Sequence, residues 1–172
     1  MNALEFVESV WQEQGEGFAF LSLRTGPRRW RDFCFKYPQD EMVLPDDSIG
    51  DVYFCPNLFK RPRRRKGMML PSCWLYADLD TVDPRGIELP VFEKPAAAWE
   101  TSPGRYQAIW LVEKGLEEEQ HSYFNQRLTY KLDADKGGWD VTQVLRVPGT
   151  VNHKYTDKPE VKLLWTEYQS LG

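Results

Sequence analysis

The spacing of apolar residues predicts a chain of short strands with two helices. Behind Asn2 and Glu5, which have the spacing of a capping box, apolar residues recur at helical intervals, so residues 3–14 are predicted to form an amphipathic helix. Apolar runs bounded by Gly, Pro and Asp predict strands at 18–23, 28–35 and 51–54. The longer segment between the last two strands is rich in Pro, Asp and Gly, and we expect it to be a loop.

The second half of the chain begins with the run 73–80, which is apolar and aromatic until it ends in Asp78-Leu79-Asp80. Further strands are predicted at 98–102, 106–112 and 161–165. The first two of these flank Pro103-Gly104 and form a predicted hairpin. The element order predicts an α+β fold with an antiparallel sheet.

Residues 117–131 are predicted to form a second helix, acidic at its start. Its predicted apolar face consists of Tyr123, Phe124, Leu128 and Leu132. His121 follows three glutamates in this helix and is expected on the surface. Residues 141–145 are expected to be a short helical or irregular piece.

Length and cysteine content indicate one domain in a reducing compartment. The 172 residues suffice for one well-filled domain, and no apolar run approaches the roughly 20 residues of a membrane span. The three cysteines are far apart and form no C-x-x-C pair, which argues against a disulfide framework or a zinc site. We therefore expect a cytoplasmic protein with no membrane contact.

The charge of the chain is unevenly distributed. The net charge is −4, yet eleven of the 22 Lys and Arg residues lie between Arg24 and Lys66, against six acidic residues. This sector contains a basic tract made of Lys60, Arg61, Arg63, Arg64, Arg65 and Lys66. A basic sector on an acidic body is typical of a protein that holds a polyanion in one place. The alternative is a solvated charge run.

The Asp78-x-Asp80 pair carries the first candidate chemistry. Because side chains alternate along a strand, both carboxylates point to one face, with Cα atoms about 6.6 Å apart. Like charges this close repel, and a divalent ion held by hard oxygen ligands relieves the repulsion. The alternative is a solvated turn after a core strand.

Two further motifs follow in sequence. The first is Thr101-Ser102-Pro103-Gly104-Arg105-Tyr106-Gln107, and the second is the run from Arg146 to Lys154, Arg-Val-Pro-Gly-Thr-Val-Asn-His-Lys. With the basic tract and the aspartate pair, they make the chain resemble the archaeo-eukaryotic primase superfamily. The resemblance is to RepB-like primases and the primase-polymerase domains of phage and plasmid replication proteins, and it covers about residues 51–155.

The resemblance implies a fold and a metal site. The expected fold is an RRM-like antiparallel catalytic sheet flanked by helices (about 69–172), with an N-terminal α/β module that includes the basic tract (about 1–68). Asp78 and Asp80 match the metal-binding pair of the family, which uses two Mg²⁺ or Mn²⁺ ions. Asp135 matches the third carboxylate, with Asp133 and Asp140 as alternatives.

The resemblance also implies a nucleotide site and a template path. Ser102, Gly104, Arg105 and Gln107 match the phosphate-binding turn, although better-known members have a histidine where this chain has Gln107. Arg146 and Lys154 would complete a cationic wall around the triphosphate. The expected template contacts are the basic tract together with Asn152 and His153, and Trp30, Tyr53 and Phe59 could stack bases.

We therefore expect an enzyme that joins nucleoside triphosphates on a single-stranded DNA template, encoded by a phage or plasmid and acting in a bacterial host. We expect it to be the N-terminal portion of a longer replication protein. Because the chain has no P-loop motif, we also expect a separate helicase as its partner. The alternatives are a non-catalytic single-strand-binding module, which Gln107 favours, and a metal-dependent nuclease. A nicking endonuclease is disfavoured because the two histidines form no metal-binding pair.

Overall fold

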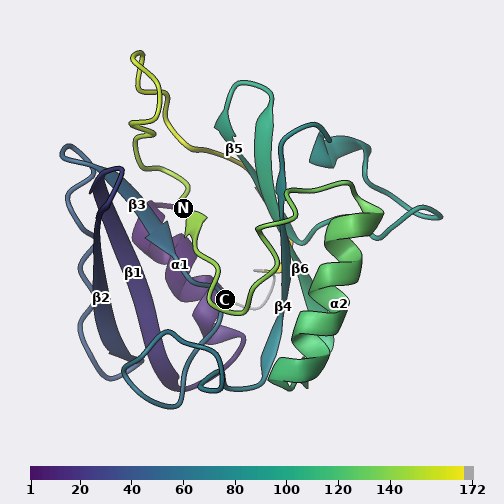
Figure 1. Cartoon of the computed structure of the whole chain (residues 1–172), viewed down its shortest axis with the longest axis horizontal. Helices are drawn as coiled ribbons and strands as arrows, with labels where there is room; N and C mark the ends of the chain where they lie inside the picture. The colour runs from purple at the N-terminus through teal and green to yellow at the C-terminus, as the bar shows by residue number, and fades with distance from the viewer. Residues whose placement is uncertain (169–172) are drawn as a thin grey trace.

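Two four-stranded antiparallel sheets form the framework of the protein in the computed structural model, which describes residues 1–168 (Figure 1). The first sheet has the order β2-β1-β3-β7, and the second has the order β4-β6-β5-β8. The strands of the first sheet are β1 (Gly17–Gly26), β2 (Arg29–Tyr37), β3 (Asp51–Phe54) and β7 (Leu145–Arg146). Those of the second are β4 (Ser72–Leu79), β5 (Ala97–Ser102), β6 (Arg105–Leu116) and β8 (Lys162–Thr166).

Helix α1 (Ala3–Gln12) lies between the two sheets (Figure 1). Its predicted capping box is confirmed, since Asn2 accepts from the backbone of Glu5 and the Glu5 side chain accepts in return. The buried face of the helix packs with both sheets in one core, and Trp74 of β4 donates to the Val10 carbonyl. The N-terminal helix therefore fixes the distance between the sheets.

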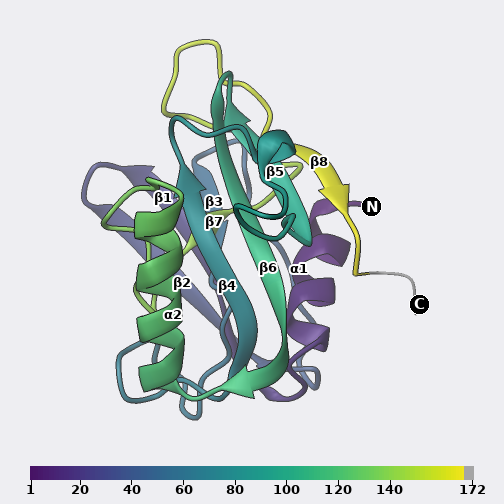
Figure 2. The same cartoon turned by 90° about the vertical axis from the view of Figure 1, so that its right-hand side faces the viewer.

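Helix α2 (Glu118–Lys131) and the loop 84–96, which contains the short 3-10 helix η1 (Pro84–Gly86), cover the outer face of the second sheet (Figure 2). Strand β4 is thus buried on both faces. Trp74 and Tyr76 point to the core between the sheets, while Leu75, Ala77 and Leu79 point toward α2. This explains why the strand reads as a continuous apolar run.

The buried face of α2 differs from the predicted one. Tyr123 and Phe124 are exposed, whereas His121 is fully buried, so its expected surface position was wrong. The His121 ring shares a hydrogen bond of 2.7 Å with the Trp74 carbonyl, and Asn125 accepts from the Tyr76 backbone. Polar side chains of α2 therefore pair with backbone groups of β4. Burial lowers the pKa of His121.

The α+β prediction with an antiparallel sheet is confirmed. Residues 141–144, expected to be a helical or irregular piece, are irregular, and strand β7 begins at the last residue of that piece, Leu145. Strand β7 pairs with β3 and brings the Arg146 region into the first sheet. None of the helices within residues 1–168 is long and apolar enough to cross a membrane.

Candidate active site

A cleft of about 370 Å³ opens between the two sheets and brings the sequence motifs together. It is lined by Arg24, Trp30, Tyr53, Asp78, Asp80, Thr101, Ser102, Arg105, Gln107, Gln143, Val144, Arg146, Asn152, Lys154 and Tyr155. The residues come from both sheets and from the segment after α2. The cleft is therefore built from parts that are distant in sequence.

The aspartate pair lies at the carboxyl end of β4, on the face that looks into the cleft. Burial, together with the charges of Asp80 and Asp135, raises the pKa of Asp78 to about 6. Asp80 forms an ion pair of 3.2 Å with Arg105. The raised pKa of Asp78 thus reflects the repulsion from Asp80 that the Asp-x-Asp spacing predicts.

The three candidates for a third carboxylate lie in different surroundings. Asp133 forms an ion pair with Lys136, and Asp140 accepts from Thr142 and pairs with Lys66. Asp135 donates its backbone N–H to the Asp78 carbonyl at 3.0 Å, which keeps the loop after α2 against the end of β4. Of these three, Asp135 is the one whose charge raises the pKa of Asp78.

Within residues 1–168, no three His, Cys, Asp or Glu side chains are already arranged as a metal-binding cluster. In this structure Asp80 is paired with Arg105, and Asp135 accepts from the Gly137 backbone. The donor set itself fits Mg²⁺ or Mn²⁺, since it offers hard carboxylate oxygens with unrelieved negative charge at Asp78.

The turn between β5 and β6 forms the wall of the cleft beside the acids. Gly104 has φ 78°, a left-handed conformation that glycine adopts without strain, so the turn closes tightly after Pro103. Ser102 and Arg105 face each other across this turn. The side chain of Ser102 is buried and hydrogen-bonds to Tyr155, which lowers the pKa of that phenol.

Gln107 lies on β6 directly opposite Asp78 in the strand register. Its side-chain oxygen accepts from the Trp99 indole at 3.0 Å and from the Arg146 backbone at 2.9 Å. Its hydrogen bond to Asp78 works against the rise in that residue's pKa. Gln107 therefore connects β5, β7 and the aspartate pair.

Arg146 and Lys154 lie in the cleft on the side facing the acids, but they differ in their partners. Arg146 forms an ion pair of 2.9 Å with Asp51, and both side chains are nearly buried (11% and 9% exposed). Lys154 forms no ion pair within residues 1–168, and its amine lies over the Tyr155 ring. Lys154 is thus the more available of the two cations.

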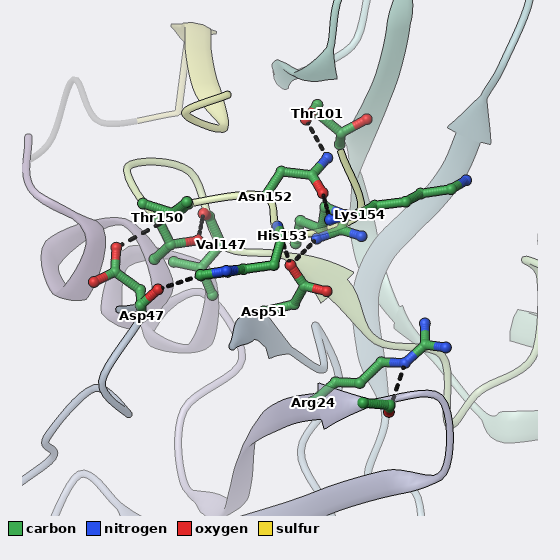
Figure 3. Close-up of polar contacts among 12 residues, drawn as sticks. Arg24, Asp47, Asp51, Thr101, Val147, Thr150, Asn152, His153 and Lys154 are labelled. Atoms are coloured by element: carbon green, nitrogen blue, oxygen red, sulfur yellow. Dashed lines mark hydrogen bonds and ion pairs between the residues drawn. The ribbon is translucent and has the colours of Figure 1, made fainter. Parts of the chain in front are cut away.

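The segment 147–154 is attached to both sheets by hydrogen bonds (Figure 3). The buried Asn152 amide donates to the Thr101 carbonyl and accepts from the Lys154 backbone. The His153 backbone donates to Asp51, and its ring shares a 2.6 Å hydrogen bond with the Asp47 carbonyl. His153 does not line the cleft, and the polar atoms of the Asn152 side chain are occupied by the protein itself.

The first sheet contributes residues that sequence reasoning did not assign to the site, namely Arg24 and Asp51. Tyr155, adjacent to the Lys154 motif, was also missed. Arg24 lies over the Trp30 ring at 5.3 Å, the Trp30 and Tyr53 rings are 5.0 Å apart, and Arg146 lies over the Tyr53 ring at 5.1 Å. This cation–aromatic row forms one wall of the cleft, with Trp30 46% exposed.

Phe59, which sequence reasoning grouped with these aromatic residues, is fully buried against Phe20 and cannot stack on a base. Its position as a core residue corrects that expectation. Phe59 thus anchors the start of the basic tract in the core and does not present its ring to solvent.

The basic tract is divided into anchored and free cations. Arg64 donates to the Thr142 carbonyl at 2.6 Å and pairs with Asp32, and Lys66 pairs with Asp140. The other four, Lys60, Arg61, Arg63 and Arg65, are exposed and form no ion pair within residues 1–168. Since Thr142 precedes the cleft residue Gln143, Arg64 fixes the tract beside the cleft.

Solved structures share this fold. The chain is similar to primase RepB′ (TM-score 0.70, 20% identity), covering 96% of this chain and 57% of that one. It is similar to the catalytic domain of primase RepB′ in complex with initiator DNA (0.68, 19%), covering 97% and 86%. It is also similar to the AEP domain of the cyanophage S-2L primase-polymerase (0.70, 11%), covering 96% and 89%. A search of curated proteins finds no match.

The two packed antiparallel sheets belong to the fold that these solved structures share. Residues 60–171 match the model of the RepB DNA-primase N-terminal domain, and the chain belongs to this family. The expected relationship to RepB-like primases is thus confirmed. The chain spans 57% of the length of the first of these solved relatives.

Proposed function

We propose that this chain joins nucleotides on a single-stranded DNA template, as a primase or polymerase of phage or plasmid replication. The proposal rests on one observation: a single cleft contains both the acids around Asp78 and the cations Arg105, Arg146 and Lys154. A triphosphate with its metal ions needs both kinds of charge within a few ångströms of each other.

Asp78, Asp80 and Asp135 would hold two Mg²⁺ or Mn²⁺ ions. When bound, such ions neutralise the triphosphate and activate the 3′-hydroxyl group of the primer. Asp80 is bound to Arg105 at 3.2 Å. Because this pair is about half exposed, separating it costs little. The Arg105 guanidinium can then turn from Asp80 to a phosphate, which it can bind through two N–H groups.

The remaining cleft residues position the nucleotide. Lys154 has no carboxylate partner within residues 1–168 and is the available point charge for a phosphate. Ser102 and Arg105, which flank the turn at Gly104, line the same space. The Trp30 ring, 46% exposed beside Arg24 and Tyr53, offers a flat apolar surface for a base.

The template would continue from the cleft to the basic tract. Arg64 keeps the tract next to the cleft through its bond to Thr142, and the exposed arginines beside it can contact phosphates without reading sequence. The polar side-chain atoms of Asn152 and His153 bind the protein itself. These two residues would therefore shape the segment that borders the template and would not contact the template through those atoms.

The test is nucleotide extension on primed and unprimed single-stranded DNA with labelled nucleotides and Mn²⁺ or Mg²⁺. We expect Asp78→Ala and Asp80→Ala to abolish product formation. Asp83→Ala is the matched control, because Asp83 follows in the same segment but pairs with Arg85 outside the cleft. If the two cleft variants extend as well as the parent, the metal assignment is wrong. Strand cleavage would indicate a nuclease, and DNA binding without product a non-catalytic module.

A further inference from the structure

A second cavity, of about 630 Å³, lies on the outer face of the second sheet, away from the acids. Leu75 of β4 and Leu128 of α2 are at its base. Val91 and Phe92 of the loop 84–96 line it on one side, and Phe124 and Tyr130 of α2 line it on the other. It is an apolar groove between the helix and the loop that cover the same face of the sheet (Figure 2).

The groove is bordered by apolar side chains that the fold leaves in solvent. Val91 is 63% exposed, Tyr130 60% and Phe124 46%. The exposed Tyr123 packs against Phe124 and extends the same surface. Large apolar residues gathered around a concavity on a globular domain are typical of a surface that binds another molecule.

Two cations lie on the helix side of the groove without a charged partner. Arg127 and Lys131 both line the groove and are one helical turn apart. Neither forms an ion pair within residues 1–168, whereas the nearby Lys136 is paired with Asp133. Arg127 is held over the Tyr123 ring at 5.4 Å, so its charge is kept on the rim of the groove. The helix side is therefore complementary to a negative group on a ligand that also has an apolar part.

We propose that this groove binds an acidic peptide segment of a partner protein. An apolar side chain of the peptide enters the cavity, and a neighbouring carboxylate contacts Arg127 and Lys131. Binding there leaves the active-site cleft open, because Leu75 and Asp78 point to opposite faces of β4. The groove thus provides a place where a replication partner can hold the domain while the cleft faces DNA.

A nucleic acid fits this surface less well. The loop 84–96 carries the exposed carboxylates of Glu88 and Glu93, so positive charge is confined to the helix side. This arrangement suits a single carboxylate beside an apolar side chain better than a continuous row of phosphates. The ring faces that stacking requires are also partly occupied. Tyr123 and Phe124 pack edge to face at 5.3 Å, and Lys136 lies over Tyr130.

The test is fluorescence polarisation with a labelled short peptide rich in Asp, Leu and Phe. Two comparison peptides replace Asp by Lys, or Leu and Phe by Ser. We expect binding of the first peptide only, and a loss of about tenfold in affinity for the Arg127→Glu, Lys131→Glu double variant. Phe124→Ala should weaken binding as well. Lys114→Glu reverses an exposed, unpaired charge away from the groove and should bind like the parent.

Both charge variants lie on the surface, so an unchanged melting temperature verifies their folding. Equal binding of the Lys peptide, no binding of the Asp peptide, or equal affinity of the double variant would each refute the proposal. A labelled single-stranded oligonucleotide is measured in parallel. If the double variant weakens only the oligonucleotide, the groove is a DNA surface and the peptide assignment is wrong. Extension activity of the double variant should equal that of the parent.

Discussion

The indole N–H of Trp99 donates a hydrogen bond of 3.0 Å to the side-chain oxygen of Gln107. The Arg146 backbone N–H donates to the same oxygen. Because both partners can only donate, the amide of Gln107 has one allowed orientation, with its NH₂ group directed away from them. Gln107 lies opposite Asp78 in the strand register and lowers the pKa of its carboxyl, so a buried tryptophan determines how the glutamine meets the acid pair.

Gln107→Glu tests this orientation with almost no change in shape. The new carboxylate keeps an oxygen for Trp99 and Arg146, but it replaces the donor facing Asp78 by a second negative oxygen. Losing the bond and adding repulsion should reduce extension by about tenfold and lower the free energy of unfolding by about 1–2 kcal/mol. Primer-extension rates and urea unfolding measure the two effects.

Gln143→Glu is the control for that variant. Gln143 also lines the cleft, but it has no hydrogen bond to Asp78. Its substitution adds the same charge to the same cleft, so any difference between the variants reports the Gln107–Asp78 contact. Equal losses in both variants would mean that negative charge alone, and not the oriented amide, is responsible.

The sequence predicted those features that depend on neighbouring residues. The capping box at Asn2 is a local arrangement, and the apolar run ending at Asp80 is buried on both faces as its pattern indicates. The family motifs placed Asp78, Arg105 and Lys154 in one site, and the structure brings them to one cleft.

The remaining features depend on pairings between distant segments. His121 follows three glutamates, and nothing near it in sequence shows that β4 places the Trp74 carbonyl beside the helix. Arg24 lines the cleft and Asp51 pairs with the cleft residue Arg146 because β1 pairs with β3 and β3 with β7. Tyr123 and Phe124 have helical spacing with Leu128, yet the helix is rotated so that polar residues meet the sheet.

The free cations of the basic tract should act on DNA binding without affecting stability. We expect the Arg61→Ser, Arg63→Ser, Arg65→Ser triple variant to bind single-stranded DNA more weakly. The slope of log affinity against log salt should fall by about 0.7 for each phosphate that the variant no longer neutralises. Arg64→Ser should instead lower the melting temperature, because it removes the bonds to Thr142 and Asp32. Salt-dependent binding and thermal unfolding distinguish the two variants. A triple variant with the parent's salt slope would exclude the tract from the template path.

His121 should make stability depend on pH in a defined range. Burial lowers its pKa in the folded protein, so the unfolded chain takes up a proton near pH 6.5 while the folded protein does not. The free energy of unfolding is therefore unaffected by this residue above that pH and decreases below it, with a slope approaching about 1.4 kcal/mol per pH unit. His121→Gln removes the effect. The stability advantage of the parent over the variant should thus shrink as pH falls from 7 to 5 in urea titrations, and parallel curves would contradict the assignment.

Asp51→Asn should be the most destabilising of these changes. Asp51 pairs with Arg146 at 2.9 Å and accepts from the His153 backbone, with both members of the ion pair nearly buried. Its removal leaves the Arg146 guanidinium without a counter-ion, which costs about 3 kcal/mol or more. The loop that carries Lys154 would loosen as well, so nucleotide KM should rise.

Glu167→Gln breaks the exposed pair with Lys94 and should cost no more than about 1 kcal/mol, which makes it the control. Similar losses in the two variants, measured by urea unfolding, would show that Asp51 does not neutralise a buried charge.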